Sequence, residues 1–339
     1  MFKARLWKKV DENRVQCQLC NHFCILKEGE TGRCGVRVNQ NNELYTLVYD
    51  KVAAINIDPI EKKPLYHFLP GTKTFSSGTV GCNFSCIFCQ NHSLSQYPKK
   101  HKEIVGERVT PEIIVEACIK YNCESISYTY SEPTIFFELM QDTARIAVKK
   151  NLKNVIVSNG FMSSKCLDEL EGLIHAANID LKSFSDEFYK KMCDGKLKPV
   201  LNNLISLKKM GIWLEITTLL IPGKNDQEKE LRDIARFIKN ELGEDVPWHI
   251  SRFHPDYQLL DSTVTPLSSL EMAYEIGVSE GLKYVYIGNV PGTTRENTYC
   301  PVCGSILIKR TGFHAEILNL KNGQCKKCKT SIPGYWENK

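Results

Sequence analysis

Strand-like and helix-like segments alternate along residues 75 to 290, and this alternation limits the folds that the chain can adopt. The strand-like runs lie at 76–80, 125–130, 154–158, 177–181, 212–221, 248–253 and 284–287. The helical segments lie at 111–121, 134–150, 163–174, 197–210, 226–242 and 268–280. Because strands separated by helices form right-handed βαβ units, the pattern predicts a parallel sheet, either doubly wound or closed toward a barrel.

Polar or glycine-containing turns follow six consecutive strand-like runs. The first of these turns carries three cysteines, and the others lie at 129–133, 158–160, 180–182, 220–226 and 252–255. Because (β/α) barrels assemble their active sites at the carboxyl ends of the strands, this placement favours a barrel. Any one of the turns can also be an ordinary helix cap, and we expect Asp226 to cap the helix that follows it.

Three cysteines at the spacing C-x3-C-x2-C, Cys82, Cys86 and Cys89, occupy the first turn. Thiolate is the ligand that iron–sulfur clusters use, and a short loop lets three sulfurs converge on one cubane. One iron is then left open, and an open metal position is a reaction centre. The alternatives are a zinc knuckle, a plain ferredoxin loop or three buried thiols, but zinc and ferredoxin sites normally have a fourth ligand nearby.

A second cysteine group precedes the barrel segment. Its members are Cys17, Cys20, Cys24 and Cys34, with glycines nearby that permit tight turns. Four thiolates this close together predict a closed four-ligand site, which we interpret as structural zinc. The compact C-x2-C-x3-C core also suits an auxiliary iron–sulfur cluster, so the metal stays open between the two.

A third group consists of two C-x2-C pairs near the end of the chain. Its members are Cys300, Cys303, Cys325 and Cys328. This spacing is typical of a zinc ribbon or a rubredoxin-like site, and we favour zinc over a single redox iron. Metal binding in small zinc modules is worth on the order of 10 kcal/mol, so this module is expected to fold almost independently. The remaining cysteines are interpreted as core or surface residues.

The composition is that of an ordinary soluble globular protein, with 42% hydrophobic and 24% charged residues. No segment approaches the roughly 18 apolar residues of a membrane span, and the N-terminus lacks the apolar core of a signal peptide. We therefore expect a cytoplasmic protein without membrane contact, whose 15 cysteines serve metals rather than disulfides. The net charge of +5 neither requires nor excludes an RNA partner.

We expect three regions: a cysteine-rich region with a β-hairpin at 1–74, the barrel at 75–290 and a zinc-ribbon-like module at 291–339. Residues 43–57 alternate and are β-rich, which predicts a hairpin or two strands. The segment 58–71 is rich in polar and aromatic groups and stands just before the cysteine loop. It is a candidate for the mouth of the site, with a proline-punctuated connector as the alternative.

The cysteine loop, with Phe88 before its last cysteine, matches the signature of the radical S-adenosylmethionine (SAM) superfamily. The Ser-Glu-Pro turn, the Ser-Asn-Gly turn, 180–182 and 221–226 resemble its pyruvate formate-lyase activating enzyme branch. The first cysteine group, 58–71 and 289–298 with the ribbon resemble the AmmeMemoRadiSam system radical SAM enzymes. Together these resemblances cover nearly the whole chain.

The resemblance implies a partial (β/α)6 TIM-type barrel and a [4Fe-4S] cluster on the three loop cysteines, with SAM on the open iron. It further implies a set of cofactor-binding residues, namely Phe88, Asn91, Ser131, Glu132, Ser158, Asn159, Asp180, Lys182 and His254. Within this set, the Lys182 ammonium suits the SAM carboxylate and the Glu132 carboxylate suits its ammonium. His254 is expected to contact the cofactor rather than act as a base, with a structural role as the alternative.

The chain departs from the branch's pattern in two places. Tyr130 and Ser131 stand where the branch has two glycines before the glutamate, which narrows the room for backbone contacts. Val157 stands where the activating enzyme has an aspartate associated with a monovalent cation, although Asp180 remains. The resemblance therefore does not carry that cation site over to this chain.

Three hypotheses for the function follow. The first is a radical SAM enzyme that acts on a protein or peptide, for instance by placing a glycyl radical, with a reducing donor such as flavodoxin or ferredoxin. The second is radical modification of RNA, which predicts an affinity that falls with rising salt. The third is a non-catalytic iron–sulfur electron carrier or zinc-stabilised scaffold.

Overall fold

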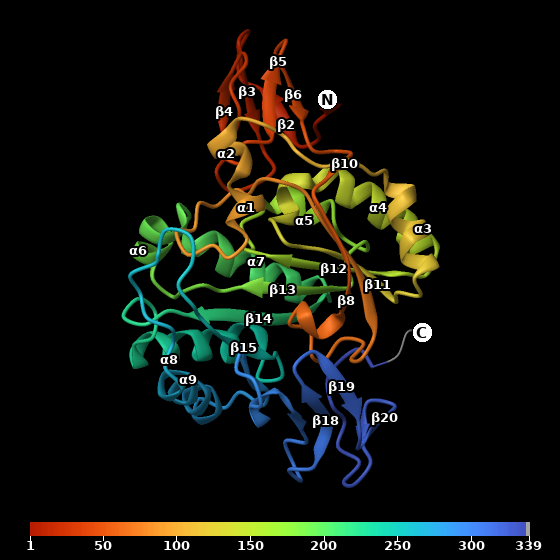
Figure 1. Cartoon of the computed structure of the whole chain (residues 1–339), viewed down its shortest axis with the longest axis vertical. Helices are drawn as coiled ribbons and strands as arrows, with labels where there is room; N and C mark the ends of the chain where they lie inside the picture. The colour runs from red at the N-terminus through yellow and green to blue at the C-terminus, as the bar shows by residue number, and fades with distance from the viewer. Residues whose placement is uncertain (337–339) are drawn as a thin grey trace.

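The computed structural model describes residues 1–336, and an eight-stranded sheet forms its centre (Figure 1). Its strands are β8 (Ala54–Pro59), β9 (Lys73–Gly78), β11 (Ser125–Tyr128), β12 (Lys153–Ser158), β13 (Ala176–Asp180), β14 (Trp213–Leu220), β15 (Trp248–Arg252) and β16 (Val285–Gly288). The strands from β9 to β16 are parallel and neighbour one another in chain order, while β8 pairs antiparallel with β9. This order is that of a barrel rather than of a doubly wound sheet, and the described strands leave the barrel open between β8 and β16.

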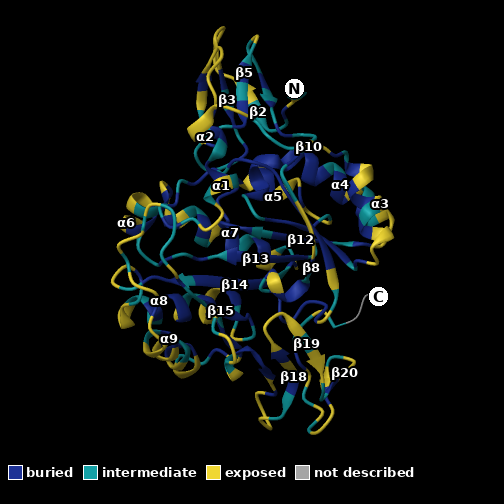
Figure 2. Ribbon diagram, viewed as in Figure 1, coloured by how far each residue is buried: buried dark blue, intermediate teal, exposed yellow. Residues whose placement is uncertain are grey.

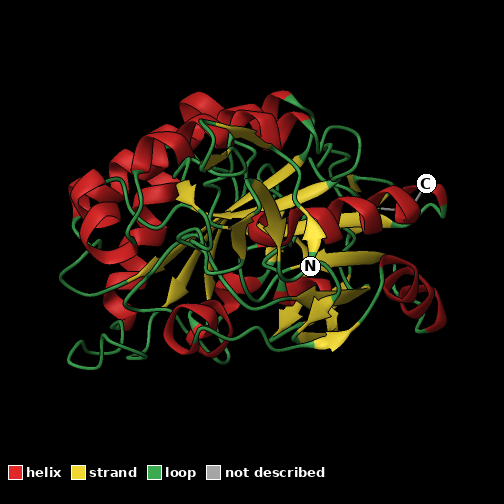
Figure 3. Ribbon diagram, turned by 90° about the horizontal axis from the view of Figure 1, so that it is seen from above, coloured by secondary structure: helices red, strands yellow, loops and turns green. Residues whose placement is uncertain are grey.

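Helices connect the parallel strands and lie outside them (Figure 3). They are α3 (Pro111–Lys120), α4 (Phe137–Lys149), α5 (Ser164–Asp168), α7 (Leu197–Lys209), α8 (Glu228–Phe237) and α9 (Leu267–Ser279). Shorter helical turns are η1 (Ile60–Lys62), α1 (His92–Ser95), α2 (Tyr97–His101), η2 (Pro133–Phe136), α6 (Asp186–Phe188), η3 (Tyr189–Cys193), η4 (Ile238–Leu242) and η5 (Thr294–Glu296). No helix within residues 1–336 combines the length and the apolar character that crossing a bilayer needs.

Two predictions about these helices are wrong. The helix expected at 163–174 ends at Asp168 and continues as turns. Asp226 does not cap α8, because Gln227 stands at the cap position. The Asp226 carboxylate instead accepts a hydrogen bond from the Gly223 N–H at 2.8 Å, so it braces the turn before the helix.

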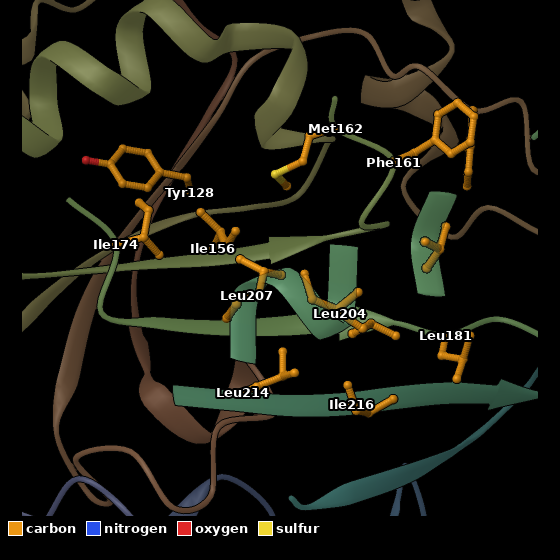
Figure 4. Packing of buried hydrophobic residues seen from close by; sticks show 14 of the residues in the cluster. Tyr128, Ile156, Phe161, Met162, Ile174, Leu181, Leu204, Leu207, Leu214 and Ile216 are labelled. Carbon is orange, nitrogen blue, oxygen red and sulfur yellow. The ribbon is translucent and has the colours of Figure 1, made fainter. Parts of the chain in front are cut away.

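The apolar core lies between the sheet and the helices. Ile156 and Ile216 on the strands lie close to Leu204 and Leu207 of α7 (Figure 4), and each of these four side chains is at most 1% exposed. Burial of each such side chain contributes about 1.5–3 kcal/mol, so this face fixes the helices onto the sheet. Figure 2 shows the same strands as the most deeply buried part of the molecule.

The opposite face of the sheet carries buried polar side chains as well as an apolar cluster, and the segment 58–71 packs against it. The buried carboxylate of Glu215 on β14 accepts hydrogen bonds from the backbone N–H groups of Tyr66 and His67 at 2.9 and 2.8 Å. It also contacts His249 Nε2 at 2.6 Å and accepts from Trp213 Nε1 at 2.9 Å. The segment expected at the mouth of the site therefore lies mainly at the amino ends of the parallel strands, which corrects that expectation.

The C-terminal module packs on the same end of the sheet. It consists of β17 (Thr298–Tyr299), β18 (Ile306–Thr311), β19 (His314–Ile317), β20 (Leu320–Lys321) and β21 (Gln324–Cys325). The buried Arg310 guanidinium donates to the Tyr66 carbonyl at 2.8 Å, and His67 contacts the Pro333 carbonyl through Nδ1 at 2.9 Å and the Tyr286 hydroxyl through Nε2 at 2.6 Å. These buried contacts join the module to the barrel, so we revise the expectation that it folds almost independently.

The cysteine-rich N-terminal region forms two small sheets above the barrel in Figure 1. One contains β1 (Phe2–Lys3), β5 (Arg37–Gln40) and β6 (Glu43–Thr46), and the other β2 (Trp7–Lys9), β3 (Arg14–Cys17) and β4 (Ile25–Lys27). Residues 43–57 form separate strands rather than a hairpin, because β7 (Lys51–Val52) pairs with β10 (Glu107–Arg108) and β8 joins the central sheet. A fully buried ion pair at 3.0 Å between Arg37 and Glu138 of α4 ties the region down.

We expect Glu215→Ala to lower the free energy of unfolding by about 3–5 kcal/mol, because four donors then lose their common acceptor in the interior. Burial alone would raise the pKa of Glu215, but the hydrogen bond from His249 and the neighbouring positive charges hold it below its usual value. This contribution to stability is present at neutral pH and is lost in acid, so the difference from the wild type should shrink below about pH 4.

Thermal unfolding followed by circular dichroism measures this difference. The matched control is Glu244→Ala, which removes an exposed carboxylate whose partner Lys283 lies at 2.8 Å. Exposed pairs contribute little, so the control should unfold almost as the wild type does. Equal shifts in Tm for the two variants would contradict the role given to Glu215.

Candidate active site

A cavity of about 150 Å³ opens at the carboxyl ends of β9, β11, β12 and β13. In Figure 1 the arrowhead of β13 points toward this side of the molecule, where α6 lies. The cavity is lined by Cys82, Phe84, Cys86, Cys89, Asn91, Ser95, Thr129, Tyr130, Ser131, Glu132, Val157, Ser158, Asn159, Asp180 and Lys182. The first four of the six polar turns predicted from the sequence therefore meet around one cavity.

The cysteine loop is held in shape by hydrogen bonds to η3 and to α2. The N–H groups of Ser85 and Ile87 donate to the carbonyls of Cys193 and Met192 at 2.9 and 3.0 Å. The ammonium of Lys99 donates to the Phe84 carbonyl at 2.6 Å and to the Ser85 hydroxyl at 2.9 Å. The loop therefore presents its three sulfurs to the cavity from a braced backbone.

The three thiols lie in surroundings that favour the neutral form until a metal binds. Burial, followed by the nearby charge of Glu132, raises the pKa of Cys82. A hydrogen bond with the Cys193 thiol, together with burial, raises the pKa of Cys86. Burial also raises the pKa of Cys89, although the Ser95 hydroxyl, 3.2 Å from its sulfur, opposes this. A cation is therefore needed to hold the three as thiolates.

The Glu132 carboxylate joins the ends of β11 and β12. One oxygen accepts from the Thr134 N–H at 3.0 Å and from the Ser158 hydroxyl at 2.8 Å, and the other accepts from the Asn159 N–H at 2.8 Å. Burial raises the pKa of Glu132, and these donors oppose the shift. The carboxylate therefore lines the cavity and also holds together the two turns that form this part of its wall.

Asp180 and Lys182 form an ion pair at 2.7 Å on the β13 side of the cavity. The Lys182 side chain is 14% exposed. Burial alone would lower the pKa of Lys182, but the charges of Asp180 and of the neighbouring thiol groups raise it well above its usual value. Lys182 is therefore a fixed positive charge beside the cysteines.

The two departures from the activating-enzyme pattern both lie on the cavity wall. Tyr130 takes a left-handed backbone conformation, with φ of 69°, and its hydroxyl donates to Asp58 at 2.5 Å along the inner face of the sheet. The Ser131 hydroxyl is buried and has no partner among the described residues, so it is free to bind a ligand. Val157 places an apolar side chain where a carboxylate would be needed for a cation.

Seven of the nine predicted cofactor-binding residues line the cavity, and Phe88 and His254 do not. Phe88 is buried next to the cavity, with the Lys182 ammonium 6.0 Å from its ring centre. His254 is exposed and contacts Gln90 Nε2 through its own Nε2 at 2.9 Å. Phe88 lies within the cysteine loop and His254 contacts Gln90 just after it, so both residues lie around the site rather than in its wall.

Other residues of the site went unpredicted. Ser95 and Thr129 line the cavity, and the thiol of Cys193 contacts Cys86. No motif marks Cys193, because a long stretch of chain separates it from the loop and the contact arises only in the fold. Ser95, by contrast, follows Cys89 closely in the chain, and this nearness to the loop is a sequence signal for its place in the site.

The C-terminal cysteines form a second kind of site. The sulfurs of Cys300, Cys303, Cys325 and Cys328 all lie within 4.8 Å of one another. The sulfurs of Cys300 and Cys328 are 3.5 Å apart, and those of Cys303 and Cys325 are 3.7 Å apart. A zinc–sulfur bond of about 2.3 Å in a tetrahedron gives sulfurs about 3.8 Å apart, so this group fits one tetrahedral ion.

The comparisons with known proteins agree with this geometry. Residues 76–238 match the model of the radical SAM superfamily. The uncharacterized protein MJ0808 of Methanocaldococcus jannaschii is 49% identical over 334 residues, which is 98% of this chain and 99% of that protein. MJ1632 of the same organism, named as a glycyl-radical enzyme activating enzyme, is 27% identical over 179 residues, which is 52% of this chain and 65% of that protein.

Among solved structures, a radical SAM methyltransferase from Sphaerobacter thermophilus superposes with a TM-score of 0.51 at 15% identity, covering 65% of this chain and 67% of that one. This likeness concerns the fold alone. The matched superfamily segment contains the cysteine loop and the turns around Glu132, Ser158 and Lys182. The chain therefore belongs to the radical SAM superfamily.

Proposed function

We propose that this chain binds a [4Fe-4S] cluster on Cys82, Cys86 and Cys89, cleaves SAM reductively and uses the resulting radical on a protein or peptide. The observation that carries the proposal is the meeting of three cysteine sulfurs, the Asp180–Lys182 pair and the Glu132 carboxylate around one cavity. When bound, the reduced cluster supplies one electron to the sulfonium of SAM, which yields methionine and a 5′-deoxyadenosyl radical that takes a hydrogen atom from the substrate.

The residues present fit a cluster with one open iron. Three thiols line the cavity, and the fourth nearby thiol, that of Cys193, is not part of its lining. Among the described residues, the Ser131 hydroxyl has no partner, and the Lys182 ammonium donates one hydrogen bond, to Asp180. Both groups can therefore donate hydrogen bonds to a polar ligand. The cavity thus offers thiolates for metal and separate polar groups for an amino acid moiety.

Each polar residue has its own task. Lys182 offers a positive charge to the carboxylate of SAM, and Glu132 and Asp180 offer negative charge to its ammonium. Asn159 donates through Nδ2 to Asn83 Oδ1 at 2.7 Å, and so holds the cysteine loop against the end of β12. Glu132 and Asn159 are buried, so this side of the cavity is shielded from water, which a primary radical requires.

A peptide glycine is the substrate class we favour. Support comes from the similarity to MJ1632, whose name states glycyl-radical enzyme activation. The cluster needs a one-electron reductant of low potential, for which a flavodoxin- or ferredoxin-type protein is suited. The C-terminal four-cysteine group lies at the other end of the sheet, and we propose that it holds structural zinc.

Anaerobically reconstituted protein with dithionite and SAM should release 5′-deoxyadenosine, measured by liquid chromatography with mass spectrometry. Cys86→Ala should abolish this product, because the cluster loses a ligand on the cavity wall. Cys123→Ala, which alters a buried cysteine away from the cavity, should keep the activity. An electron carrier or scaffold would give no 5′-deoxyadenosine in any of the three proteins, and that result would reject the enzyme.

The substrate class can be tested by deuterium transfer. Proteins from the source cells, labelled with deuterated glycine, should pass deuterium into 5′-deoxyadenosine when they are incubated with the reduced enzyme and SAM. Deuterated RNA from the same cells serves as the comparison. Deuterium arriving from RNA and not from protein would replace the peptide proposal with RNA modification.

Lys182→Met should weaken SAM binding about thirtyfold, since a charge-assisted hydrogen bond is worth about 2 kcal/mol. Lys191→Met is the control, because Lys191 forms an exposed ion pair with Glu187. Equilibrium dialysis with labelled SAM measures both. The raised pKa of Lys182 keeps it charged, so wild-type affinity should not fall between neutral and mildly alkaline pH through this residue. Unchanged affinity in Lys182→Met would refute the assigned contact.

A further inference from the structure

The four N-terminal cysteines, 17, 20, 24 and 34, line a small cavity of their own beside the cysteine loop. Cys17 stands at the end of β3, and Cys34 precedes β5. Both are buried, and Cys24 is partly exposed. The rest of the lining includes Leu19, Ile135, Arg37 and Asn83. Thiols from the end of β3 and from the two connections that follow it therefore converge on one enclosed space.

The spacing of these sulfurs is too wide for a single tetrahedral ion. Among the described residues, only the C-terminal group brings three or more metal-binding side chains within 4.8 Å of one another. The N-terminal group fails this spacing, and so does the triad of the cysteine loop. Sulfurs that each bind a different iron of a cube stand farther apart than sulfurs that share one zinc. The N-terminal group thus resembles the cubane triad and not the zinc-like group.

The space between the sulfurs supports the same assignment. The cavity holds about 20 Å³ of free volume, which accommodates a water-sized sphere. Four sulfurs at about 2.3 Å from a zinc ion would leave no such room. His22 also lines the cavity, but its Nε2 already contacts the Asn83 carbonyl at 2.8 Å, so this nitrogen is not free to bind a metal.

Two buried N–H donors without partners line this cavity. Arg37 and Asn83 are each 1% exposed, and Arg37 Nε and Asn83 Nδ2 have no hydrogen-bond acceptor among the described residues. The remaining nitrogens of Arg37 are occupied by Glu138 and by the Arg5 carbonyl. A buried donor without an acceptor costs about 1–3 kcal/mol. The sulfides and thiolates of an iron–sulfur cluster accept such donors, and these hydrogen bonds tune its potential.

Asn83 also joins this cavity to the catalytic one. It follows Cys82 in the cysteine loop, and its Oδ1 lies 3.8 Å from the Cys82 sulfur. The same oxygen accepts from Asn159 Nδ2 at 2.7 Å, and Asn159 lines the catalytic cavity. One side chain therefore touches the surroundings of both cysteine groups.

We propose that Cys17, Cys20, Cys24 and Cys34 hold a second [4Fe-4S] cluster, fully ligated by the protein, that passes electrons to the catalytic cluster across Asn83. The ligand assignment stands on these residues alone, whereas the electron transfer rests on the proposed function. A low-potential one-electron donor reduces the second cluster from the 2+ to the 1+ state. The second cluster returns to 2+ as the catalytic cluster is reduced from 2+ to 1+.

The ligand assignment is tested on the full chain with Cys82→Ala, Cys86→Ala and Cys89→Ala combined, which removes the catalytic cluster. After anaerobic reconstitution with iron, sulfide and zinc, we expect about four irons and about four sulfides per chain, with one zinc on the C-terminal group. Mössbauer spectra should show the mixed-valence signature of a cubane. About two zincs and no iron, or no metal at the N-terminal group, would overturn the assignment.

A second variant guards against misfolding. Cys24→Ser, placed alone in the wild-type background, changes the partly exposed ligand. Its zinc content and circular dichroism report whether the fold is kept, and its cubane content should fall from two per chain toward one. Cubane content equal to that of the wild type would overturn the assignment even if the triple variant were unfolded.

The electron transfer has its own readout in the wild type. Reduction of both clusters should give an electron paramagnetic resonance spectrum broadened by spin–spin interaction. The broadening should disappear in Cys24→Ser and in the triple variant. A wild-type spectrum equal to the sum of the two single-cluster spectra would reject the electron transfer and leave the ligand assignment intact. If both clusters are present but SAM is not cleaved, the proposed function is wrong, whereas the assignment of the ligands to the second cluster still holds.

Discussion

The Glu132 carboxylate is the contact on which the shape of the catalytic cavity depends. Parallel strands bring their carboxyl ends to one edge, but they do not fix the turns that follow. Glu132 does so by accepting hydrogen bonds from Thr134 beside it and from Ser158 and Asn159 on the next strand. Asn159 in turn holds Asn83 of the cysteine loop. A single buried charge therefore aligns three of the four turns that surround the cavity.

Much of the fold could be predicted from the sequence because local patterns determine it. The helix expected at 197–210 is α7 (Leu197–Lys209), and the strand expected at 154–158 is β12 (Lys153–Ser158), since each depends on the periodicity of its own residues. The position of the segment 58–71 could not be predicted. It is set by Glu215 and Arg310, which are far from it in the chain.

The same division holds for the site. The cysteine triad and the turns of Glu132 and Lys182 follow from spacing and from their places after strands, and they meet around one cavity. The contact of Cys193 with Cys86 and the position of Asn83 between the two cysteine groups depend on tertiary packing. The spacing of residues along the sequence therefore does not predict them. The choice of metal for the N-terminal group depends on the distances between its sulfurs. Those distances are set by the fold and cannot be read from the number of cysteines.

The wrapping of the segment 58–71 has a consequence for the order of events during synthesis. His67 contacts the Pro333 carbonyl, and the Phe68 backbone bridges to Tyr335, so one of the earliest strand connections is covered by one of the latest residues. Chains emerge from the ribosome amino end first, and non-local contacts form slowly. The end of the barrel that the segment 58–71 fills therefore stays incompletely covered until Pro333 and Tyr335 have been made. Loss of these two residues would remove the backbone contacts that cover His67 and Phe68.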